Sequence, residues 1–400
     1  MFLPYGRHSI GDDDIAAVIE VLKSDFLTTG PAVTAFENAL AERFQVPNVV
    51  ACMNGTAALH MAADALGVGS GDVVIVPAIT FAATANGPSM TGADVVFADV
   101  DPETGLLTGA TLAEALPRAK LAGRPRAVFP VHLNGQCVAM PDIAEIARAN
   151  ELLVVEDACH AIGGTTLGRD GVDTPVGSCA WSDAATFSFH PVKTIAMGEG
   201  GAVSTRNAAV AERLRLLRSH GITRDPKAFV HKDAAFGADG RVNPWYYEMQ
   251  VLGHNYRAPD INCALGLSQL KKLDLFAAKR RGLVAAYDEK IASLAPIVRP
   301  LPRMGGQKPV WHTYVVRIDF RATGVSRADA MRRLAEKGIG SQVHYIPVPD
   351  QPYWRARVGT VRYPGAKAYY ESVLTLPLFV EMGEEDVDRV IAALSQTLGL

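Results

Sequence analysis

The sequence predicts an α/β protein with a mostly parallel central sheet flanked by helices, followed by a smaller α+β unit. In the first 260 residues, short apolar runs alternate with stretches of helical periodicity, which is typical of a parallel sheet covered by helices. These runs are continuously apolar, as strands are when both faces of a sheet are buried. Beyond residue 260 the pattern changes to long helices with few strands, which indicates a second unit.

The expected strands of the first half are short runs rich in valine and other small apolar residues, which favour a buried pleated surface. They are expected at residues 49–53, 73–77, 95–99, 127–131, 152–156 and 185–189. Between them, apolar residues recur at helical spacing, which predicts helices at residues 57–66, 111–119 and 140–149.

The second half predicts fewer and longer elements. Helices are expected at residues 260–275, 276–294, 327–337 and 384–398, with a strand at 311–318. We therefore expect a large domain of residues 1–260 and a small C-terminal domain of residues 261–400. Residues 225–245 are polar and without periodicity, which predicts a long loop, and such loops are usually functional or mobile.

Composition narrows the function classes. A net charge of −3 gives no electrostatic case for nucleic acid or an anionic membrane. The five cysteines include no CxxC pair, so neither a disulfide framework nor a metal site is expected. No signal-peptide pattern and no apolar run long enough to span a membrane are found, so the sequence predicts a cytoplasmic protein.

Lys193 is the most informative single residue. It is the only lysine between Lys120 and Lys227, and it stands between an expected strand and the glycine-rich residues 198–201. Its neighbours are mostly apolar or small, which does not indicate a solvated basic face. An amine displaced from bulk water titrates at lower pH and can attack a carbonyl group. The alternative is a surface lysine at the edge of a loop.

Two acids, Glu156 and Asp157, follow the apolar residues of the strand expected at 152–156. A buried carboxylate needs a cation or hydrogen bonds, and a protonated pyridine nitrogen would serve. The alternative for Asp157 is the cap of a following helix. His160, three residues later, suits either a ligand contact or a structural hydrogen bond.

Other candidates stand at further strand ends. At Asn54-Gly55-Thr56-Ala57, the free N–H groups of a helix start and the Thr56 hydroxyl would bind a phosphate, although a capped helix start explains the same residues. Ser188 ends another strand, and Phe81 follows a third, where its ring would either cover a flat ligand or pack in the core. In open parallel sheets such ends face one crevice. An anion cradle, a carboxylate, a ring platform and an isolated lysine match the needs of pyridoxal 5′-phosphate (PLP).

Four segments carry a resemblance to a known family. They are residues 156–163, 187–201, 218–221 and 253–257, and in this order they resemble the DegT/DnrJ/EryC1/StrS sugar aminotransferases over nearly the whole chain. The resemblance implies the fold-type I architecture of PLP-dependent transferases, with a large PLP-binding domain and a smaller C-terminal domain. It also implies a homodimer with shared active sites.

The resemblance assigns roles by position. Lys193 would form a Schiff base with PLP and move the substrate proton, and Asp157 would hold the pyridinium nitrogen. Phe81 would stack on the ring, and His160 would contact the ring 3-oxygen, where many relatives carry glutamine. The residues placed on the phosphate are Thr56, Ala57, Ser188 and, from the neighbouring subunit, Asn255.

The implied reaction moves an amino group from L-glutamate to C4 of a nucleotide-linked 4-keto-6-deoxy sugar. Residues 245–250, 266–270 and 342–348 are most similar to the branch of the family that acts on UDP-4-keto-6-deoxy-L-AltNAc in pseudaminic acid biosynthesis. His344 and Tyr345 would line the sugar site. Candidates for the diphosphate, each of which has a solvated charge as its alternative, are Arg224, Arg241, His231 and Lys232.

Other functions stay open at this point. Relatives that aminate other nucleotide 4-keto sugars, of the GDP-perosamine, bacillosamine or legionaminic type, share much of the same sequence. Dehydratases on this scaffold carry histidine in place of the lysine, and Lys193 argues against that class. A non-catalytic regulator is a third class, and the Asp157–Lys193 pair argues against it.

Overall fold

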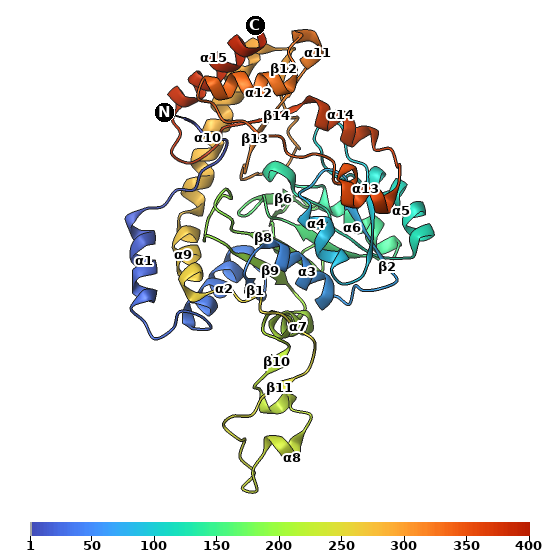
Figure 1. The fold of residues 1–400 in the computed structure, drawn as a ribbon, viewed down its shortest axis with the longest axis vertical. Coiled ribbons are helices and arrows are strands. Elements are labelled where there is room, and N and C mark those ends of the chain that lie inside the picture. Colours follow the sequence, from blue (N-terminus) through green and yellow to red (C-terminus); the bar gives the residue numbers. More distant parts are fainter. Residues whose placement is uncertain (1) are drawn as a thin grey trace.

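The computed structural model describes residues 2–400, and its centre is a seven-stranded sheet in the order β1-β9-β8-β5-β4-β2-β3 (Figure 1). Every strand is parallel to its neighbours except β9, which is antiparallel to β1 and β8. The strands are β1 (Asn48–Cys52), β2 (Asp72–Pro77), β3 (Asp94–Ala98), β4 (Arg124–Val128), β5 (Leu153–Asp157), β8 (Ala184–Ser188) and β9 (Gly201–Thr205). The mostly parallel sheet is confirmed, and β9 is a strand that the sequence pattern did not predict.

The helices that pack against this sheet and its edges are α2 (Pro31–Phe44), α3 (Gly55–Ala65), α4 (Ala83–Ser89), α5 (Gly109–Ala122), α6 (Met140–Ala149) and α7 (Ala208–Arg218). The first helix, α1 (Asp12–Leu22), packs instead against α9 (Asp260–Lys271). Helix α6 shows why such segments are helical. Pro141 occupies its first turn, where no N–H partner is needed, and Ile143 and Ala147 bury one face at a spacing of four.

The C-terminal part forms a smaller α+β unit on a three-stranded antiparallel sheet, β12 (Val298–Pro300), β13 (Tyr314–Ile318) and β14 (Val373–Leu376). The helices that follow residue 259 are α9 (Asp260–Lys271), α10 (Leu273–Ile291), α11 (Phe320–Thr323), α12 (Arg327–Glu336), α13 (Pro352–Val358), α14 (Pro364–Ser372) and α15 (Glu384–Leu398). The first two helices meet at Lys272, three residues before the junction that the sequence suggested.

Helix α10 takes part in two hydrophobic cores. Leu273 and Phe276 pack with Phe36 of α2 in the core beside β1. Further along the same helix, Tyr287 and Ile291 pack in the core of the small unit. The division into residues 1–260 and 261–400 stays a prediction.

An arm leaves the body of the molecule beyond α7 (Figure 1). It consists of the two-stranded ribbon β10 (Ile222–Thr223) and β11 (Glu248–Met249) and of the single-turn helix α8 (Lys232–Ala235). The tip of the arm and helices α12 and α15 lie at opposite ends of the molecule (Figure 1). Residues 225–245, expected as a long loop, form the tip of the arm. In addition to α8 they contain a 3₁₀ turn at Pro226–Ala228 and an isolated antiparallel bridge between Phe236 and Val242.

Within residues 2–400, no helix is both long enough and apolar enough to cross a membrane.

Candidate functional site

A cavity of about 640 Å³ lies at the carboxyl ends of the parallel strands. Segments that follow β1, β2, β5 and β8 form one side of it, and residues 342–351 of the small unit form the other. Eight of the predicted site residues line it together: Thr56, Phe81, Asp157, His160, Ser188, Lys193, His344 and Tyr345.

Lys193 presents its amine in the wall of this cavity. Within residues 2–400 its side chain has no hydrogen-bond or ion-pair partner. Burial lowers the pKa of the Lys193 amine, while the neighbouring Cys159 and Asp157 act in the opposite direction. A neutral amine is therefore reached at a lower pH than in a surface lysine, as attack on a carbonyl group requires.

Asp157 ends β5 and is buried, with 5% of the residue exposed. One oxygen accepts a hydrogen bond from the Thr84 hydroxyl at 2.7 Å, and the other accepts from the Cys159 N–H at 3.2 Å. Thr80 lies 2.6 Å from the Thr84 hydroxyl and extends this chain of hydrogen bonds. Within residues 2–400 the carboxylate forms no ion pair, so hydrogen bonds orient it while the position of a cationic partner is left open.

The start of α3 is an anion cradle. Asn54 caps the helix, and its side-chain oxygen accepts from the Ala57 N–H at 2.8 Å. That bond occupies the Ala57 N–H, so its role on a phosphate stays a prediction. The N–H groups of Gly55 and Thr56 have no partner within residues 2–400. A Cβ on Gly55 would lie 2.9 Å from the Cβ of Ser188. Glycine at this position therefore allows the hydroxyl groups of Thr56 and Ser188 to approach the same anion.

His160 lies deeper in the same cavity. Its Nδ1 is 3.3 Å from the Asn134 backbone nitrogen, and its Nε2 is 3.2 Å from the Tyr345 hydroxyl. The ring of His312 packs against it with centroids 4.3 Å apart. Burial lowers the pKa of His160 well below its ordinary value, so the ring is neutral at pH 7.

The small unit supplies the opposite wall. His344 is 2.8 Å from the Thr375 hydroxyl, and burial lowers its pKa to about 3, so this ring is neutral as well. The centroid of the Tyr345 ring lies 6.0 Å from that of Phe81, a residue that is 59% exposed and lines the cavity. This wall therefore offers neutral hydrogen-bonding groups and aromatic surface rather than charge.

Other predicted residues lie outside this cavity. Asn255 is exposed near the base of the arm, where its backbone pairs with Ser219. The predicted diphosphate ligands are all exposed on the arm, and Arg224 packs over the ring of Tyr247 at 5.5 Å. Within one chain these cations do not reach the cavity, and their roles stay predictions. They are Arg224, Arg241, His231 and Lys232.

Sequence reasoning missed several residues of the site. Thr80 and Thr84 follow β2 and are four residues apart. This spacing is a signal that could have found them, because it places two hydroxyl groups on one face of a helical turn. The pair Asn134-Gly135 is the usual signature of a tight turn. Tyr5 and His312 carry no local signal, because only the tertiary fold brings them to the cavity.

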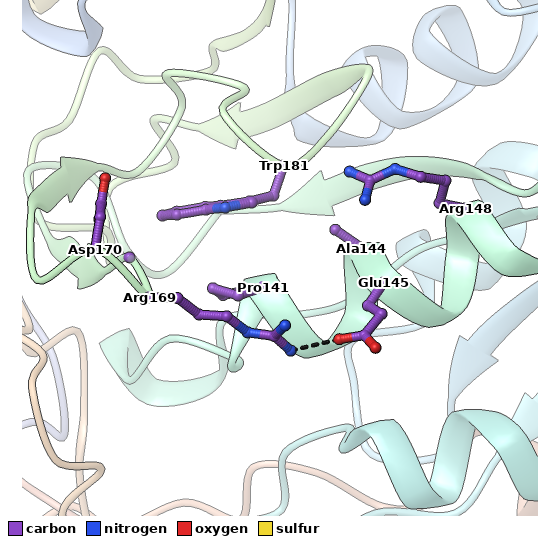
Figure 2. A pocket seen from close by; sticks show the side chains of 8 residues that line it. Pro141, Ala144, Glu145, Arg148, Arg169, Asp170 and Trp181 are labelled. Carbon is purple, nitrogen blue, oxygen red and sulfur yellow. Dashed lines mark hydrogen bonds and ion pairs between the residues drawn. The ribbon is translucent and has the colours of Figure 1, made fainter.

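A second hollow, of about 540 Å³, lies between α6 and the hairpin of β6 (Thr165–Leu167) and β7 (Asp173–Pro175). Figure 2 shows the Trp181 ring facing the Arg169–Glu145 ion pair across it. Arg169 also pairs with Asp142, so these charges tie the hairpin to α6. This hollow shares no lining residue with the larger cavity.

The residues of the larger cavity fit PLP. The uncompensated Asp157 suits a protonated ring nitrogen, and the unpaired N–H groups at α3 suit a phosphate. The unpaired Lys193 amine suits the aldehyde carbon.

Comparison with known proteins places the chain in context. The model of the DegT/DnrJ/EryC1/StrS aminotransferase family matches residues 8–395. The chain is 36% identical over 395 residues to the spore coat polysaccharide biosynthesis protein SpsC of Bacillus subtilis, covering 98% of this chain and 96% of SpsC.

Solved structures agree with this match. Helicobacter pylori PseC, an aminotransferase involved in the biosynthesis of pseudoaminic acid, superimposes with a TM-score of 0.88 and 26% identity over 100% of both chains. The PLP form of Spr1654, a putative sugar aminotransferase of Streptococcus pneumoniae, gives a TM-score of 0.86 and 26% identity. That match covers 100% of this chain and 99% of the other.

Proposed function

Because this chain belongs to the DegT/DnrJ/EryC1/StrS aminotransferase family, a family of PLP-dependent sugar aminotransferases, we propose that it transfers an amino group from L-glutamate to C4 of a nucleotide-linked 4-keto-6-deoxy sugar. The sugar that we propose is UDP-4-keto-6-deoxy-L-AltNAc. The observation that carries the reaction is the unpaired Lys193 amine facing the same cavity as the uncompensated Asp157 carboxylate.

PLP, when bound, supplies an electron sink for the negative charge that develops on the carbon losing a proton. The protein's own residues do the rest. Asp157, held by Thr84, keeps the ring nitrogen protonated. Lys193 accepts the proton from the donor amino acid and returns one to C4 of the sugar, which is general acid–base catalysis by a positioned amine. The N–H groups at the start of α3 and the Ser188 hydroxyl bind the phosphate and fix the ring.

The wall of the small unit supports a 6-deoxy sugar. Val343, Ile346 and Val348 present apolar surface to the cavity beside the polar His344 and Gln342. A methyl group at C6 suits such surface, since a hydroxyl there would lose its water without a partner. The fold similarity to PseC over the full length of both chains supports the same class of substrate.

The identity to SpsC favours a second candidate. SpsC is named for spore coat polysaccharide biosynthesis, and its 36% identity covers nearly the whole chain. A different nucleotide 4-keto sugar, destined for a surface polysaccharide, is therefore the alternative substrate.

A panel of nucleotide 4-keto sugars, each offered with L-glutamate, tests the choice. We expect the highest kcat/KM with UDP-4-keto-6-deoxy-L-AltNAc, since each mismatched group in the pocket costs about tenfold or more. Release of 2-oxoglutarate and the mass of the amino sugar are the measurements. A preference for a GDP- or TDP-linked sugar would favour the second candidate, and no amination of any sugar would refute the function.

The arm supports a homodimer. Its surface carries large apolar side chains that a monomer would leave in water, with Val230, Trp245, Met249 and Leu252 between 63% and 79% exposed. Apolar surface of this kind marks an interaction site. We propose that a second copy covers the arm and receives Asn255 and the arm's cations in its own cavity.

Mixing two inactive variants tests this arrangement. If Asn255 serves the cavity of the other subunit, a heterodimer of N255A and K193A contains one intact site. Random exchange of subunits should then restore about a quarter of the wild-type activity in a two-fold dimer. Each variant alone should remain impaired, and equilibrium sedimentation should give a dimer. Without any recovery on mixing, Asn255 would act within its own chain or not at all.

A further inference from the structure

A tight turn lies behind His160 in the cavity wall. Asn134 and Gly135 both have positive φ, 62° and 96°, and Gln136 N–H donates to the Leu133 carbonyl at 3.0 Å. These features define a type I′ turn, for which Asn-Gly is the preferred pair because both central residues must be left-handed. A Cβ on Gly135 would clash with the Val310 carbonyl oxygen, so glycine is required there.

Asn134 is buried and bonded on every side. Its side-chain oxygen accepts from the Thr313 hydroxyl at 2.8 Å, and its side-chain nitrogen donates to the Tyr369 hydroxyl at 3.1 Å. Its carbonyl accepts from the His312 N–H at 3.1 Å. Asn134 is only 2% exposed. Because its side chain and its carbonyl are both held by hydrogen bonds, the direction of its backbone N–H is fixed as well.

That N–H points at Nδ1 of His160 from 3.3 Å. A backbone N–H can only donate, so Nδ1 must present its lone pair, and a neutral ring then carries its hydrogen on Nε2. The low pKa that burial imposes on His160 supports the neutral ring. Nε2 lies 3.2 Å from the Tyr345 hydroxyl, so it donates there, and the hydrogen of Tyr345 is free for another acceptor.

We propose that the Asn134-Gly135 turn locks His160 in its Nε2–H form, so that His160 is a permanent hydrogen-bond donor toward the cavity and Asn134 is a positioning residue for the cofactor. The proposal rests on the proposed function, in which the ring 3-oxygen of PLP replaces the Tyr345 oxygen as the acceptor of the Nε2 hydrogen. A donor binds that oxygen best when it is negatively charged. A glutamine at this position would offer an N–H without a choice of tautomer, whereas histidine needs a partner that makes the choice.

The tautomer is measured without any cofactor. In the apoprotein labelled with ¹⁵N-histidine, the ring nitrogens of His160 are assigned by comparison with the H160Q variant. We expect Nε2 to carry the hydrogen and Nδ1 to be unprotonated near neutral pH. A hydrogen on Nδ1, or on both nitrogens, would overturn the proposal.

Two substitutions separate the turn from the side-chain contacts. N134G removes the bonds to Thr313 and Tyr369 but keeps a left-handed residue, whereas N134V also forces the turn out of the left-handed region. We expect N134V to weaken PLP binding about tenfold more than N134G, the effect of one hydrogen bond to a charged oxygen. Absorbance titration measures both.

The same pair in the H160Q background is the control. Glutamine has no tautomer to fix, so the difference between valine and glycine at position 134 should vanish there. A difference of the same size in both backgrounds would show that Asn134 acts only on stability, which contradicts the proposal. Failure of the wild-type chain to bind PLP would instead refute the proposed function, while the nitrogen spectra still decide the tautomer.

Discussion

Lys193→Ala is expected to lower the rate of amino transfer by about 10⁴-fold, the upper end of the contribution of one acid–base group. In the proposed function the same amine would both attack the cofactor aldehyde and carry the proton, and within residues 2–400 the cavity lining contains no second lysine. Lys193→Arg should be equally inactive, because a guanidinium keeps the charge but does not deprotonate. The measurements are single-turnover kinetics and the absorbance of the PLP-loaded protein.

Lys120→Ala is the matched control, since Lys120 is exposed on α5 and outside the cavity. It should retain full activity and the absorbance of the wild type. The lowered pKa of Lys193 adds a test by pH. Uptake of PLP by the apoprotein should rise with pH and level off below the ordinary lysine pKa of about 10.4. Turnover within tenfold of wild type in Lys193→Ala would remove this residue from its role.

Asp157→Asn is expected to reduce turnover by about 10²–10³-fold, a loss typical of removing one preorganised electrostatic group. The amide keeps the size of the side chain but no longer favours a protonated ring nitrogen. Stability should not fall, because a buried and unneutralised charge is removed. Turnover and the midpoint of urea unfolding of the apoprotein are the two measurements.

Its neighbour Glu156 is the matched control with opposite expectations. Glu156 is also buried, but it is paired with His132 at 2.9 Å and with the Ser182 hydroxyl at 2.5 Å. Glu156→Gln should therefore lower the free energy of unfolding by about 1–3 kcal/mol while leaving turnover nearly intact. If Asp157→Asn kept near-wild-type turnover, the assignment of the ring-nitrogen partner to Asp157 would be wrong.

The central sheet was predictable because strands buried on both faces leave continuous apolar runs in the sequence. Strand β9 was not, because its buried residues include Ser204 and Thr205, which read as polar. Both hydroxyl groups find hydrogen-bond acceptors in the folded chain. The Ser204 hydroxyl donates to the Gly177 carbonyl at 2.7 Å, and the Thr205 hydroxyl donates to the Asp183 carbonyl at 2.7 Å. A hydrogen bond made only in the folded chain leaves no periodic signal.

The site divides in the same way. That Asp157, Ser188 and Lys193 line one cavity could be predicted, because they stand at or just beyond strand ends, where a parallel sheet gathers its ligands. Thr84 reaches Asp157 across 73 positions, and no local pattern encodes that distance. The sequence could not show which cavity the cations of the arm serve, because their proposed role depends on a second copy of the chain.

Helix α10 contributes residues to two hydrophobic cores, and this sharing decides whether the large and the small unit could fold separately. A fragment ending ahead of α9 would lose Cys263, Leu273 and Phe276 from the core beside β1. A fragment starting there would lose Leu3, which packs in the core of the small unit. Neither fragment would keep a complete interior. Recombination between relatives at this junction would therefore have to exchange matched packing partners, which favours inheritance of the chain as one piece.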